Sequence, residues 1–532
     1  MPPQPPTPLR PEPTSPEAPF APAPEPSLLD AAGVELTAQE PVPTLLRRVR
    51  NELAASFDVR KPTRIARAPG RLDVMGGIAD YTGSVVCEAT LDRAAAVAVQ
   101  RRDDRDVQVI GLNLLDQHLP FTLVIPLESL ALPIDELRRN FAEPGRTWAG
   151  YLAGCLAILH DEKLIDLRDP AITGFNIALY STVPLGAGVS SSAAIEVAMM
   201  TALVEELDSK FQIRKTPSGP MKIAAMCQRV ENQIVGAPCG IMDQAASCAG
   251  EIGSLMRMKC QPHELLAPLH LPAGVRAVGI NSNVKHSVGG GQYGRTRCAA
   301  FMGHKIILEK MKQMGGAGGQ TLVADPMNGY LANLPLDDYK RFFRPYLPET
   351  IRGGQFLLQY GPTIDKATTV EPDAEYRVQG ATDHHVFEAH RVNEFIRYIE
   401  EVNALDAQIA PPAHTDAHGS AVENRDRKLL LDKAGHLMYA SHISYTNDAL
   451  LGADECDLLV ALARAREPAG IYGAKITGGG SGGTVAILCN TGDSVDTAIS
   501  EIMHDYEQKT GLKPEAFLAS SQGAWAAGTA VV

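Results

Sequence analysis

The chain of 532 residues lacks the features that mark several common classes of protein. Its nine cysteines are an odd number, lie far apart and include no C-x-x-C pair, so neither a disulfide framework nor a zinc ribbon is indicated. No apolar run approaches the length of about 18 residues that a membrane-spanning helix needs, and the N-terminus lacks the basic and apolar regions of a secretory signal. Positive charge is in deficit, with 49 Lys and Arg against 62 Asp and Glu, which would repel nucleic acid and anionic lipid. We therefore expect a cytoplasmic protein with reduced thiols and with neither a nucleic-acid nor a membrane partner.

Proline is concentrated at the start of the chain. The first 26 residues contain 12 of the 38 prolines, and such a run builds neither helix, sheet nor core. We predict a disordered tail over residues 1–42. The remainder is long enough for two to four domains of about 150 residues each, and 45% of the chain is hydrophobic, which suffices for a large core.

From Val42 onward, apolar periodicity and turn residues predict a mixture of helices and strands without an internal repeat. Arg64–Ala68 predicts a strand that enters a turn at Pro69–Gly70. Further strands are expected at 94–100, 106–110, 172–180, 275–281 and 484–488, and helices at 43–53, 148–160, 190–207, 221–234, 297–311, 389–409, 426–447, 455–466 and 493–510. This succession predicts an α+β protein with two lobes.

One glycine- and serine-rich segment, Val183–Ala194, follows a predicted strand and opens a long predicted helix. Gly186 and Gly188 would let backbone amides approach a phosphate closely, and the helix dipole favours negative charge at that point. The hydroxyls of Ser190–Ser192 could cap the helix, hold phosphate oxygens or bind magnesium. The segment predicts an anion site, with an ordinary helix cap after a flexible loop as the alternative.

Two other segments are rich in glycine. Pro69–Gly83 places Arg71 and Asp80 on a predicted turn-rich loop, where the arginine could balance phosphate charge and the aspartate could accept sugar hydroxyls; a structural ion pair is the alternative. Thr477–Gly483 matches G-x-G-x-x-G, but it precedes a strand instead of a helix, which rejects a dinucleotide site and leaves a tight hairpin as the alternative. The chain contains no G-x-x-x-x-G-K-[ST] sequence, which excludes a P-loop.

The order of these three segments resembles the GHMP small-molecule kinases. The likeness to galactokinases continues through residues 227–233 (CQRVENQ), 239–244 (CGIMDQ), 281–286 (NSNVKH) and Tyr293. Residues 68–81 and 474–483 are similar to the kinase portion of plant-type L-arabinokinases, and the resemblance runs from about Thr63 to the C-terminus. It implies an N-terminal α/β lobe like domain 2 of ribosomal protein S5 over residues 43–265, a ferredoxin-like lobe over residues 266–532, and an active site between them.

The resemblance also implies roles for individual residues. Asp243 would accept the proton of the anomeric hydroxyl, and Arg71 would stabilise charge as the phosphoryl group moves. The implied cofactors are ATP and Mg²⁺, with Ser192 and Glu231 as the metal ligands. The sugar would contact Gly77, Ile78, Asp80 and Tyr293, and ATP would contact Pro184, Gly186, Ala187, Gly188, Val189, Ser190, Ser191, Ser192, Ala193, Gly479 and Gly480.

The implied activity is phosphorylation of a sugar at its anomeric hydroxyl. Galactokinases usually carry Glu-His where this chain has Gly77 and Ile78, and the loss of those polar groups favours L-arabinose, which has the shape of galactose without the exocyclic hydroxymethyl group. The product would be β-L-arabinose 1-phosphate. Galactokinase activity is the alternative within the same class, and a non-catalytic sensor of ATP and sugar is the alternative from another class. We expect only small-molecule partners and a monomer, with a weak dimer as the alternative.

Histidines at two places raise other possibilities. His384, His385, Glu388 and His390 lie close together, but the spacing is not H-E-x-x-H and no cysteine is near, so we expect a structural role instead of a zinc site. On a later predicted helix, His442 and Tyr445 could approach the sugar or simply pack in the core.

Overall fold

The computed structural model describes residues 35–532 except 208–211, 238, 285–290, 317–324 and 410–419. Most of the predicted proline-rich tail and the Lys285–His286 part of a predicted motif lie outside the described residues. Residues 36–38 form a short turn in which Leu36 is fully buried, so the expected tail is structured before it reaches residue 42. Within the described part of the chain, no helix combines the length and the apolar character that crossing a membrane requires.

The first sheet is built on a long hairpin of β1 and β2, which pair antiparallel. Its strand order is β15-β1-β2-β5-β3-β4, while β6 pairs with β2 and with the short strands β7 and β8. Only β3 and β5 are parallel neighbours among the described pairs of this sheet. The strands are β1 (Thr63–Met75), β2 (Val85–Arg101), β3 (Asp106–Gly111), β4 (Thr122–Pro126), β5 (Phe175–Ser181), β6 (Ser254–Lys259), β7 (Glu264–Leu265), β8 (Leu269–His270) and β15 (Thr529–Val531).

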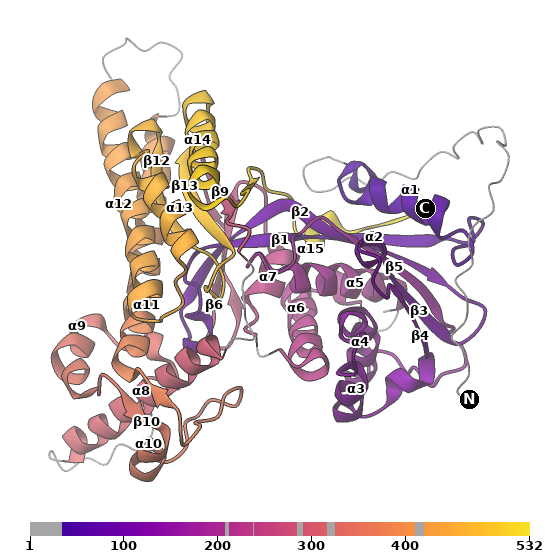
Figure 1. Ribbon diagram of the computed structural model, residues 1–532, viewed down its shortest axis with the longest axis horizontal. Coiled ribbons are helices and arrows are strands. Elements are labelled where there is room, and N and C mark those ends of the chain that lie inside the picture. The colour runs from indigo at the N-terminus through magenta and orange to yellow at the C-terminus, as the bar shows by residue number, and fades with distance from the viewer. Residues whose placement is uncertain (1–34, 208–211, 238, 285–290, 317–324, 410–419) are drawn as a thin grey trace.

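Helices cover both faces of this sheet, because successive side chains of a strand point to opposite faces. Ala66 and Val97 belong to a core that includes α4 and α5, whereas Ile65 and Ala96 pack with α1 on the other face. Figure 1 shows α1 on one side of the sheet and α3 to α6 on the other. The helices of this half are α1 (Val42–Glu52), α2 (Leu112–Asp116), α3 (Ile134–Phe141), α4 (Thr147–Asp161), α5 (Ser191–Leu207), α6 (Gly219–Arg229), α7 (Met242–Ala249) and α15 (Ala524–Ala527).

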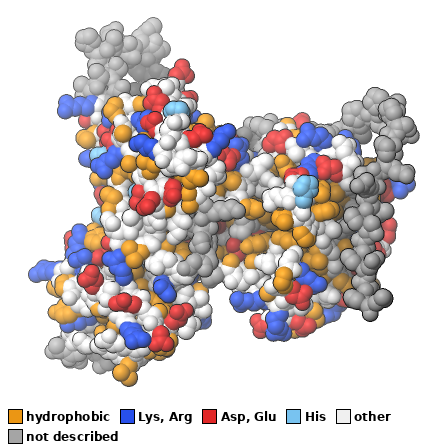
Figure 2. Space-filling view, in the orientation of Figure 1, with side chains coloured by type: hydrophobic (Ala, Val, Ile, Leu, Met, Phe, Trp, Pro, Cys, Tyr) orange, Lys and Arg blue, Asp and Glu red, His pale blue; other side chains and the backbone are white. Residues whose placement is uncertain are grey.

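A second sheet has four strands in the order β12-β13-β9-β14 and is antiparallel. Its core includes Tyr445 and Tyr506, contributed by the helices that pack against it. The space-filling view shows a notch at its lower edge, between the first half of the molecule and the part formed by the chain that follows β9 (Figure 2). The elements are β9 (Val275–Asn281), β12 (Ile471–Ile476), β13 (Thr484–Asn490), β14 (Glu515–Phe517), α13 (Asp454–Arg464) and α14 (Asp493–Thr510).

A helical region lies between β9 and β12 in the sequence. The long helices α11 and α12 stand side by side, and a smaller group of elements around α8 has its own core, which contains Tyr339 and Phe356 (Figure 1). The elements are α8 (Gln292–Gly316), α9 (Leu336–Asp338), β10 (Ile351–Arg352), α10 (Gly353–Tyr360), β11 (Glu375–Tyr376), α11 (Val378–Ile409) and α12 (Ser420–Asn447). Short 3₁₀ or π-helical turns are η1 (Leu36–Ala38), η2 (Asp80–Thr82), η3 (Leu127–Ala131), η4 (Ile213–Lys215), η5 (Val230–Val235), η6 (Leu331–Asn333), η7 (Tyr339–Phe343), η8 (Arg344–Tyr346) and η9 (Glu467–Ala469).

The predicted two-lobed α+β fold is confirmed, but the predicted turn at Pro69–Gly70 is wrong. β1 continues to Met75, and its pairing with β2 shifts register between Pro69 and Arg71. A bulge accommodates proline because proline has no N–H to donate to the ladder. Arg71 and Asp73 therefore lie on a strand and not on a loop.

The last strand returns to the first half of the fold. β15 pairs antiparallel with β1, with Val531 opposite Arg64. A domain boundary after residue 265 stays a prediction. It would place β15 in the second domain, although β15 pairs with β1 of the first sheet.

Candidate active site

A cavity of about 340 Å³ brings the three glycine-rich segments together. The predicted site residues that line it are Arg71, Ile78, Asp80, Pro184, Gly186, Ala187, Gly188, Val189, Ser190, Ser191, Ser192, Glu231, Asp243, Tyr293 and Gly479. Gly77, Ala193 and Gly480 are predicted site residues outside this lining.

The loop before α5 has the backbone that its sequence predicts. Gly186 and Gly188 have φ values of 73° and 70°, which glycine adopts without strain. The hydroxyls of Ser190 and Ser191 are buried and have no hydrogen-bond partner within the described residues. Because a buried hydroxyl without a partner is unfavourable, these groups fit a ligand with acceptor oxygens, such as a phosphate at the N-terminus of α5.

Both halves of the fold hold this loop. Arg71 Nη1 donates to the carbonyl oxygen of Gly188 at 2.7 Å, and Thr484 Oγ1 donates to that of Ala187 at 2.8 Å. The loop is therefore fixed by β1 on one side and by β13 on the other.

Arg71 and Asp243 meet at the cavity from distant parts of the sequence. Arg71 Nη2 and Nε donate to Asp243 Oδ1 at 2.7 and 3.1 Å. The Arg71 side chain is 3% exposed, whereas that of Asp243, in the first turn of α7, is 24% exposed. Burial alone would lower the pKa of Arg71, but the carboxyl groups of Asp243 and Glu88 raise it, so the guanidinium stays charged. The pair places a fixed positive charge beside a carboxylate that the cavity can reach.

Glu231 lies in the π-helical turn η5, which interrupts the helix predicted over residues 221–234. Its carboxylate accepts hydrogen bonds from the Ser192 hydroxyl and from Gln244 Nε2, the latter at 2.8 Å. Burial, followed by repulsion from Asp243, raises the pKa of Glu231 to about 7. A divalent cation would offset both effects, and Ser192 and Glu231 supply the hard oxygen ligands that Mg²⁺ prefers. The residues present therefore fit Mg²⁺.

Those two residues would not complete a coordination shell alone. Among the residues that the structure describes, no group of three His, Cys, Asp or Glu side chains is arranged to hold a metal ion. Magnesium usually keeps several waters and binds substrate phosphates, so the remaining ligands would come from those sources.

The same cavity carries the sugar-binding candidates. Asp80 begins the turn η2 and is 5% exposed, and burial raises its pKa to about 6. Its carboxylate packs against Gly240, where any side chain would overlap with it. Tyr293 and Tyr81 are in edge-to-face contact, with ring centroids 6.2 Å apart. The lining thus combines a carboxylate, a phenol and the apolar side chain of Ile78.

Gly77 does not reach the cavity, because its neighbours occupy the space where a side chain would extend. A Cβ on Gly77 would overlap with the Asp73 carboxylate and the Tyr445 hydroxyl. Tyr445 is fully buried and donates to the carbonyl oxygen of Gly478 at 2.9 Å. Of the pair Gly77–Ile78, only Ile78 is placed to meet a ligand.

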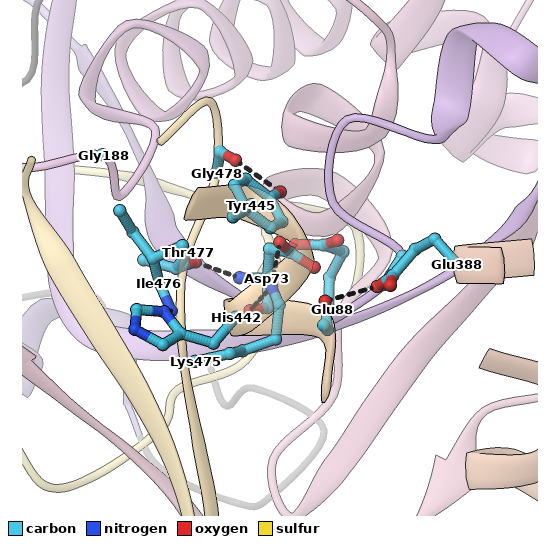
Figure 3. A network of polar contacts seen from close by, with 12 residues as sticks. Asp73, Glu88, Gly188, Glu388, His442, Tyr445, Lys475, Ile476, Thr477 and Gly478 are labelled. Atoms are coloured by element: carbon cyan, nitrogen blue, oxygen red, sulfur yellow. Dashed lines mark hydrogen bonds and ion pairs between the residues drawn. The ribbon is translucent and has the colours of Figure 1, made fainter. Parts of the chain in front are cut away.

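A buried ion pair between the two halves was not predicted from the sequence. Lys475 Nζ on β12 lies 2.6 Å from Asp73 Oδ2 on β1, and both side chains have zero exposure. Thr477 Oγ1 accepts a hydrogen bond from the Asp73 backbone N–H at 2.6 Å (Figure 3). The signal that could have revealed the pair is a lysine inside an apolar strand, since a buried ammonium needs a partner.

A second cavity, of about 370 Å³, adjoins the first and shares Tyr151, Pro184, Leu185 and Ser192 with it. Its lining is mostly apolar and includes Trp148. The sequence prediction missed this cavity, because much of its wall comes from α2, α4 and β5, which lie outside the predicted segment Val183–Ala194.

His442 and Tyr445 lie behind the glycine loop and outside the cavity lining. His442 Nδ1 accepts a hydrogen bond from the Ile476 backbone at 3.3 Å, and its Nε2 lies 3.0 Å from Asp457 Oδ1. These contacts fix the strand that leads into the loop.

The histidine-rich start of α11 is buried and makes polar contacts. His384 Nδ1 lies 3.0 Å from Ser444 Oγ, and His385 Nε2 lies 3.1 Å from the carbonyl oxygen of Ile78. Glu388 Oε1 accepts from the Gly76 backbone N–H at 3.2 Å. These residues support the segment that leads to Asp80.

Three stretches of the chain match known family profiles. Residues 151–251 match the GHMP kinases N terminal domain, and residues 427–507 match the GHMP kinases C terminal domain. Residues 51–101 match the galactokinase galactose-binding signature.

Individual proteins show the same likeness. L-arabinokinase of Arabidopsis thaliana is 33% identical over 527 residues, which cover 90% of this chain and 47% of that protein, so the chain spans about half the length of this relative. Galactokinase of Chloroflexus aggregans is 28% identical over 452 residues, which cover 85% of this chain and 90% of that protein. The structure of Lactococcus lactis galactokinase complexed with galactose matches with a TM-score of 0.64 and 19% identity, covering 91% of this chain and 99% of that one.

The fold, the cavity and these matches define a two-lobed protein of a small-molecule kinase family. The chain belongs to the GHMP kinase family. Its named relatives within that family are sugar kinases.

Proposed function

We propose that the chain is an ATP- and Mg²⁺-dependent sugar 1-kinase that converts L-arabinose to β-L-arabinose 1-phosphate. The observation that carries the proposal is the position of the Arg71–Asp243 pair, which lies in the same cavity as the serine loop and the sugar-binding candidates Asp80 and Tyr293. Phosphoryl transfer depends on positioning and electrostatic stabilisation more than on covalent chemistry, so this set of residues suits it.

The nucleotide would lie across the two adjoining cavities. Its phosphates fit the loop before α5, where the hydroxyls of Ser190 and Ser191 lack partners among the described residues. Its base fits the apolar cavity beside Trp148, because a planar aromatic group would bury apolar surface there. Ser192 and Glu231 would hold Mg²⁺, which supplies neutralisation of the phosphate charge when bound.

The chain's own residues would move one proton and stabilise one charge. Both hydrogen bonds from Arg71 go to Asp243 Oδ1, which leaves Oδ2 to accept the proton of the anomeric hydroxyl. The sugar oxygen bonds to the γ-phosphorus while the bond to the β,γ-bridging oxygen breaks, and ADP leaves. Arg71 remains charged throughout and stabilises negative charge on the transferred group.

Support for L-arabinose comes from Ile78 and from the 33% identical relative named L-arabinokinase. An apolar side chain at the sugar end offers no hydrogen-bond partner to an exocyclic hydroxymethyl group. Discrimination by one such group in an apolar pocket is about 10- to 200-fold. Galactose is the alternative substrate, supported by the signature over residues 51–101 and by the galactokinase relative.

Release of ADP measured across a panel of aldoses tests the proposal. We expect the highest kcat/KM for L-arabinose. A kcat/KM for galactose that equals or exceeds the value for L-arabinose would reassign the substrate to galactose. Tight binding of both ATP and sugar without any ADP formation would point to a sensor. An Ile78→Ser variant should raise the kcat/KM for galactose relative to that for L-arabinose. A substitution at Gly77 would be harder to interpret, because a side chain there would displace Asp73 and Tyr445.

A further inference from the structure

Arg71 contacts carboxyl groups from two different elements. Asp243 on α7 accepts hydrogen bonds from Nε and Nη2, while Glu88 Oε2 on β2 lies 3.3 Å from the same Nε. The Nε–H is therefore bonded to one carboxylate and lies within reach of a second.

Glu88 is an acceptor without a bond in this state. It is fully buried and does not line the cavity, so it is not placed to touch a substrate. In the described part of the chain, neither of its carboxyl oxygens has a hydrogen-bond partner. A buried polar group without a partner is destabilising and calls for an explanation. A second state of Arg71, in which this acceptor is used, would provide one.

The local charges explain why Asp243 holds Arg71 in the resting state. The buried cations Arg71 and Lys475 form ion pairs with three carboxyl groups, those of Asp73, Glu88 and Asp243. Asp73 lies directly opposite Glu88 in the pairing of β1 with β2. Burial, followed by the charge of Asp73, raises the pKa of Glu88 well above its usual value. Burial and the charge of Asp73 thus disfavour the charged form of Glu88, and the partly exposed Asp243 carboxylate is the stronger acceptor.

The relative strength of these two acceptors changes during the proposed reaction, so the inference rests on the proposed function. When Asp243 takes the proton of the sugar hydroxyl, it becomes neutral and its charge-assisted bonds to Arg71 weaken. We propose that Glu88 is a positioning residue that then accepts the Nε–H of Arg71 and keeps the guanidinium directed at the transferred phosphoryl group. Glu88 would accept through Oε2, which already lies 3.3 Å from Nε, so it exchanges no proton with the substrate and touches no substrate atom.

Equilibrium binding of ATP measures this role without turnover. Titration calorimetry with ATP and Mg²⁺ would compare the full-length wild type with Asp243→Asn, Glu88→Met and the double variant. The amide that Asp243→Asn introduces is permanently neutral, so Arg71 should depend on Glu88 in that background. We expect each single substitution to raise the Kd for ATP by less than about threefold. The double variant should raise it about tenfold more than the product of the two single effects, because both residues belong to one ion-pair network around Arg71.

Two further variants separate this role from a general effect on β2. Glu88→Gln keeps an acceptor oxygen and should restore most of the affinity in the Asp243→Asn background. Cys87→Ala changes the neighbouring buried residue, which points to the opposite face of the strand, and should not be coupled to Asp243→Asn. Thermal unfolding would check that each variant folds, and Glu88→Ala would replace Glu88→Met if that variant does not.

The outcomes distinguish this inference from the proposed function. Losses that simply multiply in the double variant, or a coupling as large for Cys87→Ala as for Glu88→Met, would overturn the role of Glu88. A wild type that binds no ATP would instead overturn the proposed function.

Discussion

Replacement of Lys475 by methionine should strongly destabilise the protein. Methionine is similar in length to lysine but carries no charge, so Lys475→Met leaves the Asp73 carboxylate in the interior without its ammonium partner. The two side chains are 2.6 Å apart and have zero exposure, so water cannot replace the lost partner. Breaking a buried pair from one side lowers the free energy of unfolding by about 3–5 kcal/mol.

The loss should depend on pH in a defined direction. Burial already raises the pKa of Asp73, although Lys475 lowers it, so removal of the lysine should raise it further. A carboxyl group whose pKa is higher in the folded state binds an extra proton on folding, and this makes folding more favourable as pH falls. Urea unfolding followed by circular dichroism should therefore show a larger deficit at neutral pH than at mildly acidic pH.

Two comparisons make the stability prediction specific. Lys428→Met removes an exposed lysine, 61% accessible, from its pair with Asp432 and should change the free energy of unfolding by less than about 0.5 kcal/mol. Adding Asp73→Leu to Lys475→Met removes the buried charge and should recover most of the lost stability. A Lys475→Met protein as stable as the parent at neutral pH, or a double variant no more stable than the single one, would refute the reasoning.

Three further predictions concern the active site. Asp243→Asn should lower kcat by about 10²- to 10⁴-fold in an ADP-release assay while ATP still binds, because it removes the proposed base; an unchanged kcat would eliminate Asp243 from that role. Gly240→Ala should raise the sugar KM by about tenfold or more and leave the ATP KM unchanged, because the added Cβ would displace the Asp80 carboxylate. An unaltered sugar KM would mean that Asp80 does not contact the sugar. The pKa of Asp80 is raised to about 6, so kcat/KM for the sugar should fall as pH drops below that value, where the protonated group accepts fewer hydrogen bonds. Asp80→Asn should lack this inflection, and its persistence in the variant would assign it to another group.

Elements with strong local signals were predictable from the sequence. α14 has its predicted bounds, because Gly492 and Gly511 flank it and Gly511 takes the left-handed conformation that ends helices. β9 also has its predicted bounds, since it is a short run of small and β-branched residues in the middle of a sheet. Here the local pattern and the tertiary structure agree.

Bounds failed where distant partners decide the structure. α11 begins at Val378, before the predicted Ala389, because its first turns bury polar residues such as His385 and Glu388 against the segment that follows β1. β1 passes through Pro69 because β2 pairs with it on both sides of a bulge. Neither partner can be identified from the local sequence.

The candidate site divides in the same way. The serine loop was predictable, because glycine conformations and a helix start are local properties. The roles of Asp73, Lys475 and Glu88 were not, because each depends on a side chain from another strand that the fold brings within ion-pair distance.

The π-helical turn η5 constrains the length of the chain near the active site. The Glu231 carbonyl accepts the N–H groups of Gly236 and Ala237, at 2.8 and 3.0 Å, beyond the spacing of an α-helix. One extra residue in a helical turn rotates the following chain by about 100°. Deleting a single residue here would restore ordinary helix geometry and redirect the chain that leads to Asp243. The proposed proton acceptor would then be separated from Glu231, the proposed magnesium ligand, although neither side chain had changed.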